Sequence, residues 1–161
     1  MTNAEQRRLS ATAIWIAQFV GREIRVLDAS QAFQLLGTEP DTNLISVAYQ
    51  SVNRLENTGQ LAWLKETGLL SIWLLGMFNP SPGLTMVLPY RKGPVQSLGP
   101  VVNDDYFGKV PAGRLVIGDS VIYFKGDGEY RSKIGLSPER AKDVMGSYDQ
   151  FSRTLTVVKY S

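Results

Sequence analysis

The chain has 161 residues, with 17 basic and 15 acidic side chains, a net charge of +2, and neither cysteine nor histidine. A charge this small and dispersed gives no nucleic-acid footprint, and the lack of cysteine excludes disulfides and thiolate metal sites. Without histidine, any catalysis must use carboxylates, lysine, tyrosine or arginine. The longest apolar runs are about half the length that spans a bilayer. We therefore expect a soluble chain without a membrane partner.

The N-terminal segment, residues 1–21, reads as an atypical extension. Ala4–Val20 has apolar residues at helical spacing, but many of them are β-branched or aromatic types that favour strands, so we expect a strand. No small-residue cleavage signal follows Arg7-Arg8, so no secretory signal peptide is expected, and the compartment is left open.

A strand and a helix are predicted next. Glu23–Leu27 alternates apolar and charged residues, which is typical of a half-buried strand. Asp28 or Ser30 can cap a short helix that runs to Leu36, and Gly37 is suited to end it in the left-handed conformation.

The middle of the chain favours strands and one long loop. Leu44–Asn57 alternates, while Leu69–Phe78 is so continuously apolar that we expect a central strand covered on both faces. Thr85–Leu88 reads as a strand stopped by Pro89. Arg91–Val102 contains two prolines and two glycines with little periodicity, which indicates a long and functional loop.

The last third is predicted to contain a β-hairpin. Arg114–Ile117 and Val121–Lys125 alternate on either side of Gly118-Asp119, a tight-turn signal. Glu129–Ile134 and Thr154–Val158 read as further strands. Strands without a βαβ rhythm, together with one or two short helices, predict an all-β fold: an antiparallel β-sandwich formed as a single domain by residues 1–161.

Acidic and amide side chains gather on either side of the hairpin. Asn103, Asp104 and Asp105 precede it, and Asp127 and Glu129 follow it. Such oxygen ligands can hold calcium, and two carboxylates can work as an acid/base pair. Because the spacing fits no calcium loop, solvated turn carboxylates are the favoured interpretation, and no cofactor is predicted.

The same segments carry cations and aromatic rings, which is the combination that a sugar site needs. The alternative is an ordinary charged sheet face whose ion pairs contribute little. Among the tryptophans, Trp73 is expected in the core and Trp63 is the best candidate for a ligand platform. The predicted binding residues are Arg54, Trp63, Arg91, Asn103, Asp104, Tyr106, Lys109, Lys125, Tyr130, Arg131 and Lys133.

Several segments together resemble an uncharacterised bacterial family of the galactose-mutarotase-like β-supersandwich proteins. They read VAYQSVNRLENTG, KETGLLSIWLLGMFNPSP, VNDDYFGKVPAGRL and FKGDGEYRSKIGLSP, and the resemblance spans about Arg22 to Ser161. It implies a supersandwich with a concave face that binds carbohydrate. In mutarotases a histidine donates a proton to the ring oxygen of the sugar, and a glutamate late in the chain removes the proton from the anomeric hydroxyl.

This chain departs from that pattern at both catalytic positions. It has no histidine, and the strand expected to carry it reads Gly68–Trp73; the chain also stops after Thr154–Tyr160, before the expected glutamate strand. The sequence therefore resembles a partial-length member. Open strand edges in a truncated sandwich favour self-association, so we expect a homo-oligomer.

Two functions follow from the sequence. The first is a carbohydrate-acting protein, in which Asp105 and Asp127 would carry out sugar isomerisation or glycoside hydrolysis. The alternative is a non-catalytic carbohydrate-binding or oligomerising module, which the missing histidine and the missing strand favour. In both, the groove is formed by the Asn103–Lys109 and Lys125–Lys133 segments.

Overall fold

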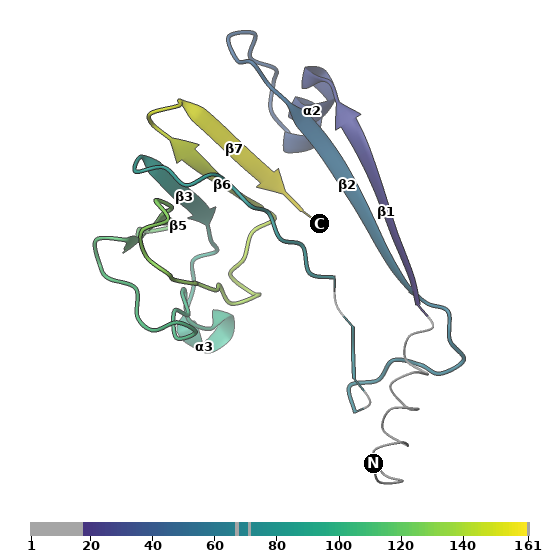
Figure 1. Cartoon of the computed structure of the whole chain (residues 1–161). Helices are drawn as coiled ribbons and strands as arrows, with labels where there is room; N and C mark the ends of the chain where they lie inside the picture. The colour runs from purple at the N-terminus through teal and green to yellow at the C-terminus, as the bar shows by residue number, and fades with distance from the viewer. Residues whose placement is uncertain (1–17, 67, 71, 161) are drawn as a thin grey trace. The chain divides into compact units, whose positions relative to one another are not determined.

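The computed structural model describes residues 18–66, 68–70 and 72–160, and their regular structure is mostly antiparallel β-sheet (Figure 1). The chain divides into two compact units, Met1–Gly76 and Met77–Ser161. Unit 1 contains a two-stranded sheet and helix α2, and unit 2 contains a five-stranded sheet and the short helix α3. The predicted all-β class, with antiparallel sheets and two short helices in the described ranges, is confirmed. The single-domain organisation stays a prediction.

Unit 1 is built on a long antiparallel ribbon of β1 (Gln18–Leu27) and β2 (Ala48–Asn57). The ladder runs from Gln18 opposite Asn57 to Leu27 opposite Ala48. The predicted strand at Glu23–Leu27 is confirmed as the second half of β1. The predicted strand at Ala4–Val20 lies outside the described residues as far as residue 17.

Helix α2 (Ala29–Leu36) follows β1 and contacts both strands of the ribbon. The Asp28 side chain accepts a hydrogen bond from the Gln31 backbone N–H at 2.8 Å, and the Gln31 side chain accepts one from the Asp28 N–H at 3.0 Å. This reciprocal capping box satisfies two amides that a helix start leaves unpaired. Gly37 ends the helix with φ 73°, as predicted.

Asp28→Ala is expected to destabilise α2 by about 1 kcal/mol, because the N-terminal amides lose their acceptor. Hydrogen exchange at the amides of α2 measures the change. The matched control is Ser30→Ala, at the other candidate cap position, which should leave exchange nearly unchanged. Equal effects of the two substitutions would contradict the assignment of Asp28 as the cap.

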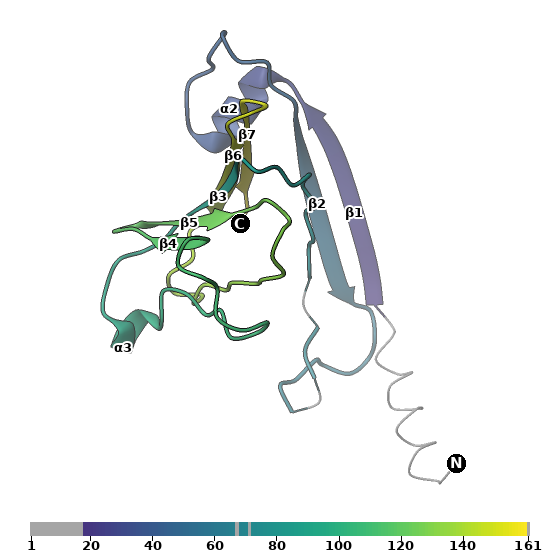
Figure 2. The same cartoon turned by 60° about the vertical axis from the view of Figure 1, so that its left-hand side comes forward.

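Unit 2 is built on a five-stranded antiparallel sheet in the order β4-β5-β3-β6-β7. Figure 2 shows β4 and β5 crossing the direction of β6 and β7, so the sheet is strongly twisted, as β-sheets are. Its edge strands are β4 and β7, and self-association through strand edges stays a prediction. The strands are β3 (Leu84–Pro89), β4 (Leu115–Ile117), β5 (Val121–Lys125), β6 (Val144–Asp149) and β7 (Thr154–Lys159).

The predicted hairpin is confirmed as β4 and β5, with Val116 opposite Tyr123. The turn is closed by the Gly118 N–H, which donates to the Val121 carbonyl at 2.9 Å. Ile122 on β5 is fully buried beside the central strand, opposite Leu88. Tyr90, directly after β3, is also buried, and its hydroxyl donates to the Gly118 carbonyl at 2.7 Å. The hairpin is thereby fixed to the centre of the sheet.

Two predicted strands are wrong. Leu69–Phe78 forms no strand within the described residues, and Trp73, expected in the core, is 82% exposed. An apolar run becomes a covered strand only where neighbours pair with it, and this run crosses the boundary between the two units at Gly76. Its apolar character therefore did not predict burial.

Glu129–Ile134 is also not a strand. Asp127 accepts a hydrogen bond from the Glu129 N–H at 3.0 Å, and Gly128 has φ 78°, so the chain turns where pairing would begin. The predicted loop at Arg91–Val102 is confirmed, with one added turn, α3 (Val95–Leu98). In the part of the chain that the structure describes, no helix is long and apolar enough to cross a membrane.

Candidate functional site

Two loops of unit 2 are fastened together beside the hairpin. Asn103 and Gly135 form an isolated β-bridge, in which each backbone N–H donates to the other residue's carbonyl at 2.8 Å. Segments before and after the hairpin therefore meet at this bridge, which lies two residues beyond the Lys125–Lys133 segment of the predicted groove. Both residues of this bridge line the pocket of the candidate site.

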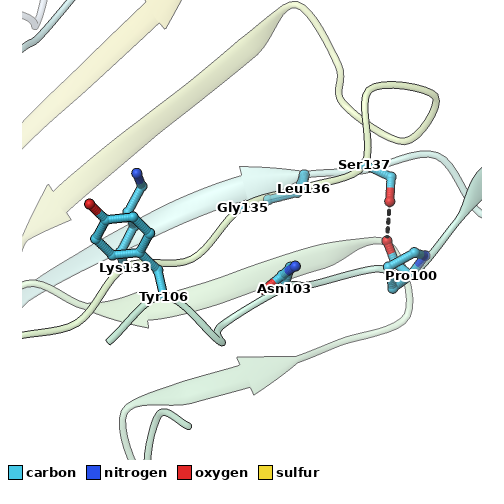
Figure 3. A pocket seen from close by; sticks show the side chains of 7 residues that line it. All are labelled: Pro100, Asn103, Tyr106, Lys133, Gly135, Leu136 and Ser137. Carbon is cyan, nitrogen blue, oxygen red and sulfur yellow. Dashed lines mark hydrogen bonds between the residues drawn. The ribbon is translucent and has the colours of Figure 1, made fainter. Parts of the chain in front are cut away.

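An open pocket of about 370 Å³ lies on this bridge, near the lower end of the range for small-molecule sites. Figure 3 shows Tyr106 and Lys133 side by side at one end and Asn103 between them and the other end. At that other end the Ser137 hydroxyl donates to the Pro100 carbonyl at 2.7 Å (Figure 3). The lining residues are Pro100, Asn103, Tyr106, Lys133, Gly135, Leu136 and Ser137.

Four side chains form a cation–aromatic ladder that begins in the pocket with Lys133 and Tyr106 and continues beside it with Phe107 and Arg131. The Lys133 ammonium lies 4.2 Å from the centre of the Tyr106 ring, and the Arg131 guanidinium lies 4.3 Å from the centre of the Phe107 ring. The two rings meet edge to face at 4.6 Å. Such contacts hold cations in place without neutralising them.

The buried carboxylate of Asp104 is used to shape its own loop. It accepts hydrogen bonds from the Lys109 ammonium at 2.7 Å and from the Val110 backbone N–H at 3.0 Å. These bonds hold the pKa of Asp104 below its usual value, the lysine contributing most, and raise the pKa of Lys109. Asp105 also pairs with Lys109, at 2.7 Å. Asp104 and Lys109 therefore support the loop that carries Tyr106.

Asp127 lies in a separate buried cluster. Its side chain is 1% exposed. It accepts hydrogen bonds from both terminal nitrogens of Arg114 and forms an ion pair with Lys125 at 3.1 Å. Arg114 also lies under the Tyr130 ring at 5.4 Å. The guanidinium contributes most to holding the pKa of Asp127 far below its ordinary value. Lys125 and Tyr130 thus belong to this cluster and do not line the pocket.

Arg140 fixes the loop at the far end of the pocket. Its side chain is buried and donates to the carbonyls of Gly99 at 2.7 Å, Arg91 at 3.0 Å and Gly93 at 3.0 Å. The Arg91 guanidinium is exposed and donates only to the Glu139 carbonyl among the described residues, at 3.3 Å. Arg91 therefore contributes backbone to this clamp and is not a pocket-lining residue.

The two remaining predicted binding residues lie in unit 1. Arg54 on β2 is exposed and pairs with Glu56 at 2.9 Å. Trp63 lies in the irregular segment after β2 and is partly exposed. Neither belongs to the pocket, which is lined by residues of unit 2.

The predicted catalytic pair is not brought together in one cluster. Asp105 pairs with Lys109, and Asp127 pairs with Arg114. Because the pKa of Asp127 is strongly lowered, this group has no proton to donate near neutral pH, which argues against a general acid there. No group of three potential metal ligands is found within residues 18–66, 68–70 and 72–160, so no calcium site is assigned.

Sequence reasoning missed Arg114, Pro100, Ser137 and Arg140. The predicted hairpin could have indicated the ion pair of Arg114 with Asp127. It places Arg114 opposite Lys125, whose N–H donates to the Arg114 carbonyl at 2.8 Å, and Asp127 follows Lys125 by two residues. Ser137 and Arg140 contact residues about forty positions away, Pro100 and Gly99, and no local pattern reports such contacts.

The fold and the pocket together define an all-β protein with an open, cation-bearing pocket beside a β-hairpin. The sequence model of a family of unknown function, DUF6786, matches residues 6–161, and the chain belongs to this family. No curated protein and no solved structure matches the chain.

Proposed function

We propose that unit 2 binds carbohydrate, without turnover, in the pocket between Pro100 and Ser137. The observation that carries the proposal is the composition of the pocket. Tyr106 offers an aromatic ring, while Asn103, Lys133 and Ser137 offer groups that hydrogen-bond hydroxyls. Tyr106 is 70% exposed, so the ring surface that Lys133 and Phe107 do not contact is open to a ligand.

Binding is favoured over catalysis because of where the carboxylates lie. The lining of the pocket contains no aspartate or glutamate. Asp104 and Asp127 are both engaged by cations and backbone amides. A glycosidase of the usual kind needs two carboxyl groups flanking the scissile bond. Reducing-sugar release and polarimetry should therefore show no turnover of any saccharide that binds.

The resemblance to galactose-mutarotase-like proteins supports the same ligand class. In those proteins the ligand lies on the concave face of a supersandwich. The proposal here requires only the pocket of unit 2 and transfers no catalytic role. The absence of histidine from this sequence agrees with a binding function.

Tyr106→Ala is expected to weaken saccharide binding at least about fivefold, because the ring that stacks on the sugar is removed. Isothermal titration of the full chain with neutral and acidic oligosaccharides measures the effect. Tyr123→Ala is the matched control, since Tyr123 is a half-exposed tyrosine of β5 outside the pocket. Binding that is unchanged in Tyr106→Ala, or lost equally in both variants, would contradict the pocket as the binding site.

A further inference from the structure

One cation that lines the pocket, Lys133, and one that lies beside it, Arg131, have no acidic partner in the described part of the chain. Lys133 and Arg131 are exposed, and neither is within 4.0 Å of a carboxylate oxygen in the ranges that the structure describes. By contrast, the cations Lys109, Arg114 and Lys125 of the neighbouring clusters all pair with aspartates. The charge of Lys133 in the pocket lining is therefore not neutralised by an ion pair in the described ranges.

The two cations are also held in position. Lys133 lies over the Tyr106 ring and Arg131 over the Phe107 ring, and the two rings contact each other. Exposure alternates from Arg131 to Gly135, with Arg131, Lys133 and Gly135 exposed and Ser132 and Ile134 half-buried. Arg131 and Lys133 are therefore both exposed and are held by two rings that contact each other.

The two acidic side chains of the loop that carries Tyr106 do not line the pocket. Asp104 and Asp105 both pair with Lys109, and Asp104 is buried. Their carboxylates are thus turned to Lys109, while Lys133 lines the pocket. A ligand in the pocket meets an ammonium, an amide, a hydroxyl and a ring, with no carboxylate in the lining.

From this we propose that the ligand is an acidic saccharide, whose carboxylate or sulfate is bound by Lys133 while its ring lies against Tyr106. The inference rests on the proposed carbohydrate site and adds its charge preference. A cation forms stronger hydrogen bonds with a charged acceptor than with a neutral hydroxyl. Arg131, which lies over Phe107 beside the pocket, adds a second positive charge nearby.

The test is calorimetric titration of the full chain with trigalacturonate, with its fully methyl-esterified form, and with a sulfated galactose trisaccharide. The esterified ligand keeps the rings and removes the charge, and we expect it to bind at least about tenfold more weakly than the acid. The sulfated ligand distinguishes the two anions: tighter binding of trigalacturonate assigns the carboxylate, and tighter binding of the sulfated sugar assigns the sulfate.

Lys133→Met is expected to remove that tenfold preference while retaining weak binding of the esterified ligand. Lys142→Met is the matched control, because it removes one exposed lysine charge of unit 2 outside the pocket. Equal affinity for acid and ester would overturn the charge preference and leave the carbohydrate site standing. Failure of all three ligands and of neutral oligosaccharides to bind would overturn both. A preference that survives Lys133→Met would place the anion elsewhere and overturn the inference.

Discussion

Arg140→Met should destabilise unit 2 by about 3 kcal/mol, with a fall in Tm of roughly 10–20 °C. Methionine keeps most of the apolar volume of the side chain and removes the guanidinium. The carbonyls of Gly99, Arg91 and Gly93 then lose their buried donors. Because these carbonyls belong to one loop, the loss should also open residues 91–99 to hydrogen exchange.

Two variants test the origin of this effect. Arg91→Met removes an exposed guanidinium and leaves the Arg91 carbonyl in place, so its effect should stay within about 0.5 kcal/mol. Arg140→Lys keeps the charge but not the planar fork, and it should fall between the other two. If Arg140→Met melts within about 2 °C of the unsubstituted protein, the loop is not held by this side chain.

Asp127→Asn is expected to lower the Tm of unit 2 by roughly 10 °C or more. Asparagine keeps the shape of the side chain, but it leaves the Arg114 guanidinium, whose side chain is 15% exposed, without its counter-charge. The Arg114 Nε already has no hydrogen-bond partner in the described part of the chain. Thermal unfolding followed by circular dichroism measures the loss.

The matched control is Asp119→Asn, at an exposed turn position where the carboxylate pairs with Lys92. Exposed pairs contribute little, so this variant should melt close to the unsubstituted protein. Similar falls in Tm in both variants would show that the buried Asp127 pair stabilises the protein no more than the exposed Asp119 pair does.

The same cluster makes the stability of unit 2 depend on pH in the acid range. The pKa of Asp127 is lower in the folded protein than in the unfolded chain, mainly because of Arg114. The stabilisation is therefore complete above the unfolded pKa of about 4 and is lost as pH falls below it toward the folded value. Asp127→Asn should flatten this part of the pH profile, and an unchanged acid limb would contradict the role of Asp127.

The hairpin and α2 were predictable because their signals are local. Gly118-Asp119 lies between two alternating runs, and Asp28 and Gly37 mark the two ends of α2. The strand predicted at Leu69–Phe78 failed for the opposite reason. Its pattern says that the residues are apolar, while strand formation depends on a neighbour that the sequence does not specify.

The site was predicted in part for the same reason. Asn103, Tyr106 and Lys133 flank the hairpin, so a correct hairpin brings them to one pocket. Asp127 was expected to be a catalytic group, but burial beside Arg114 gives it a structural role. Arg140 and Ser137 act through backbone carbonyls about forty residues away, and carbonyls carry no sequence signature.

The central claim is that the pocket between Pro100 and Ser137 binds carbohydrate. The most direct measurement is the amide NMR spectrum of the full chain during titration with trigalacturonate and with a neutral oligosaccharide. The account predicts concentration-dependent shifts at Asn103, Tyr106, Lys133 and Gly135, with β6 and β7 unchanged. Shifts confined to β1 and β2, or no shifts with either ligand at millimolar concentration, would contradict it.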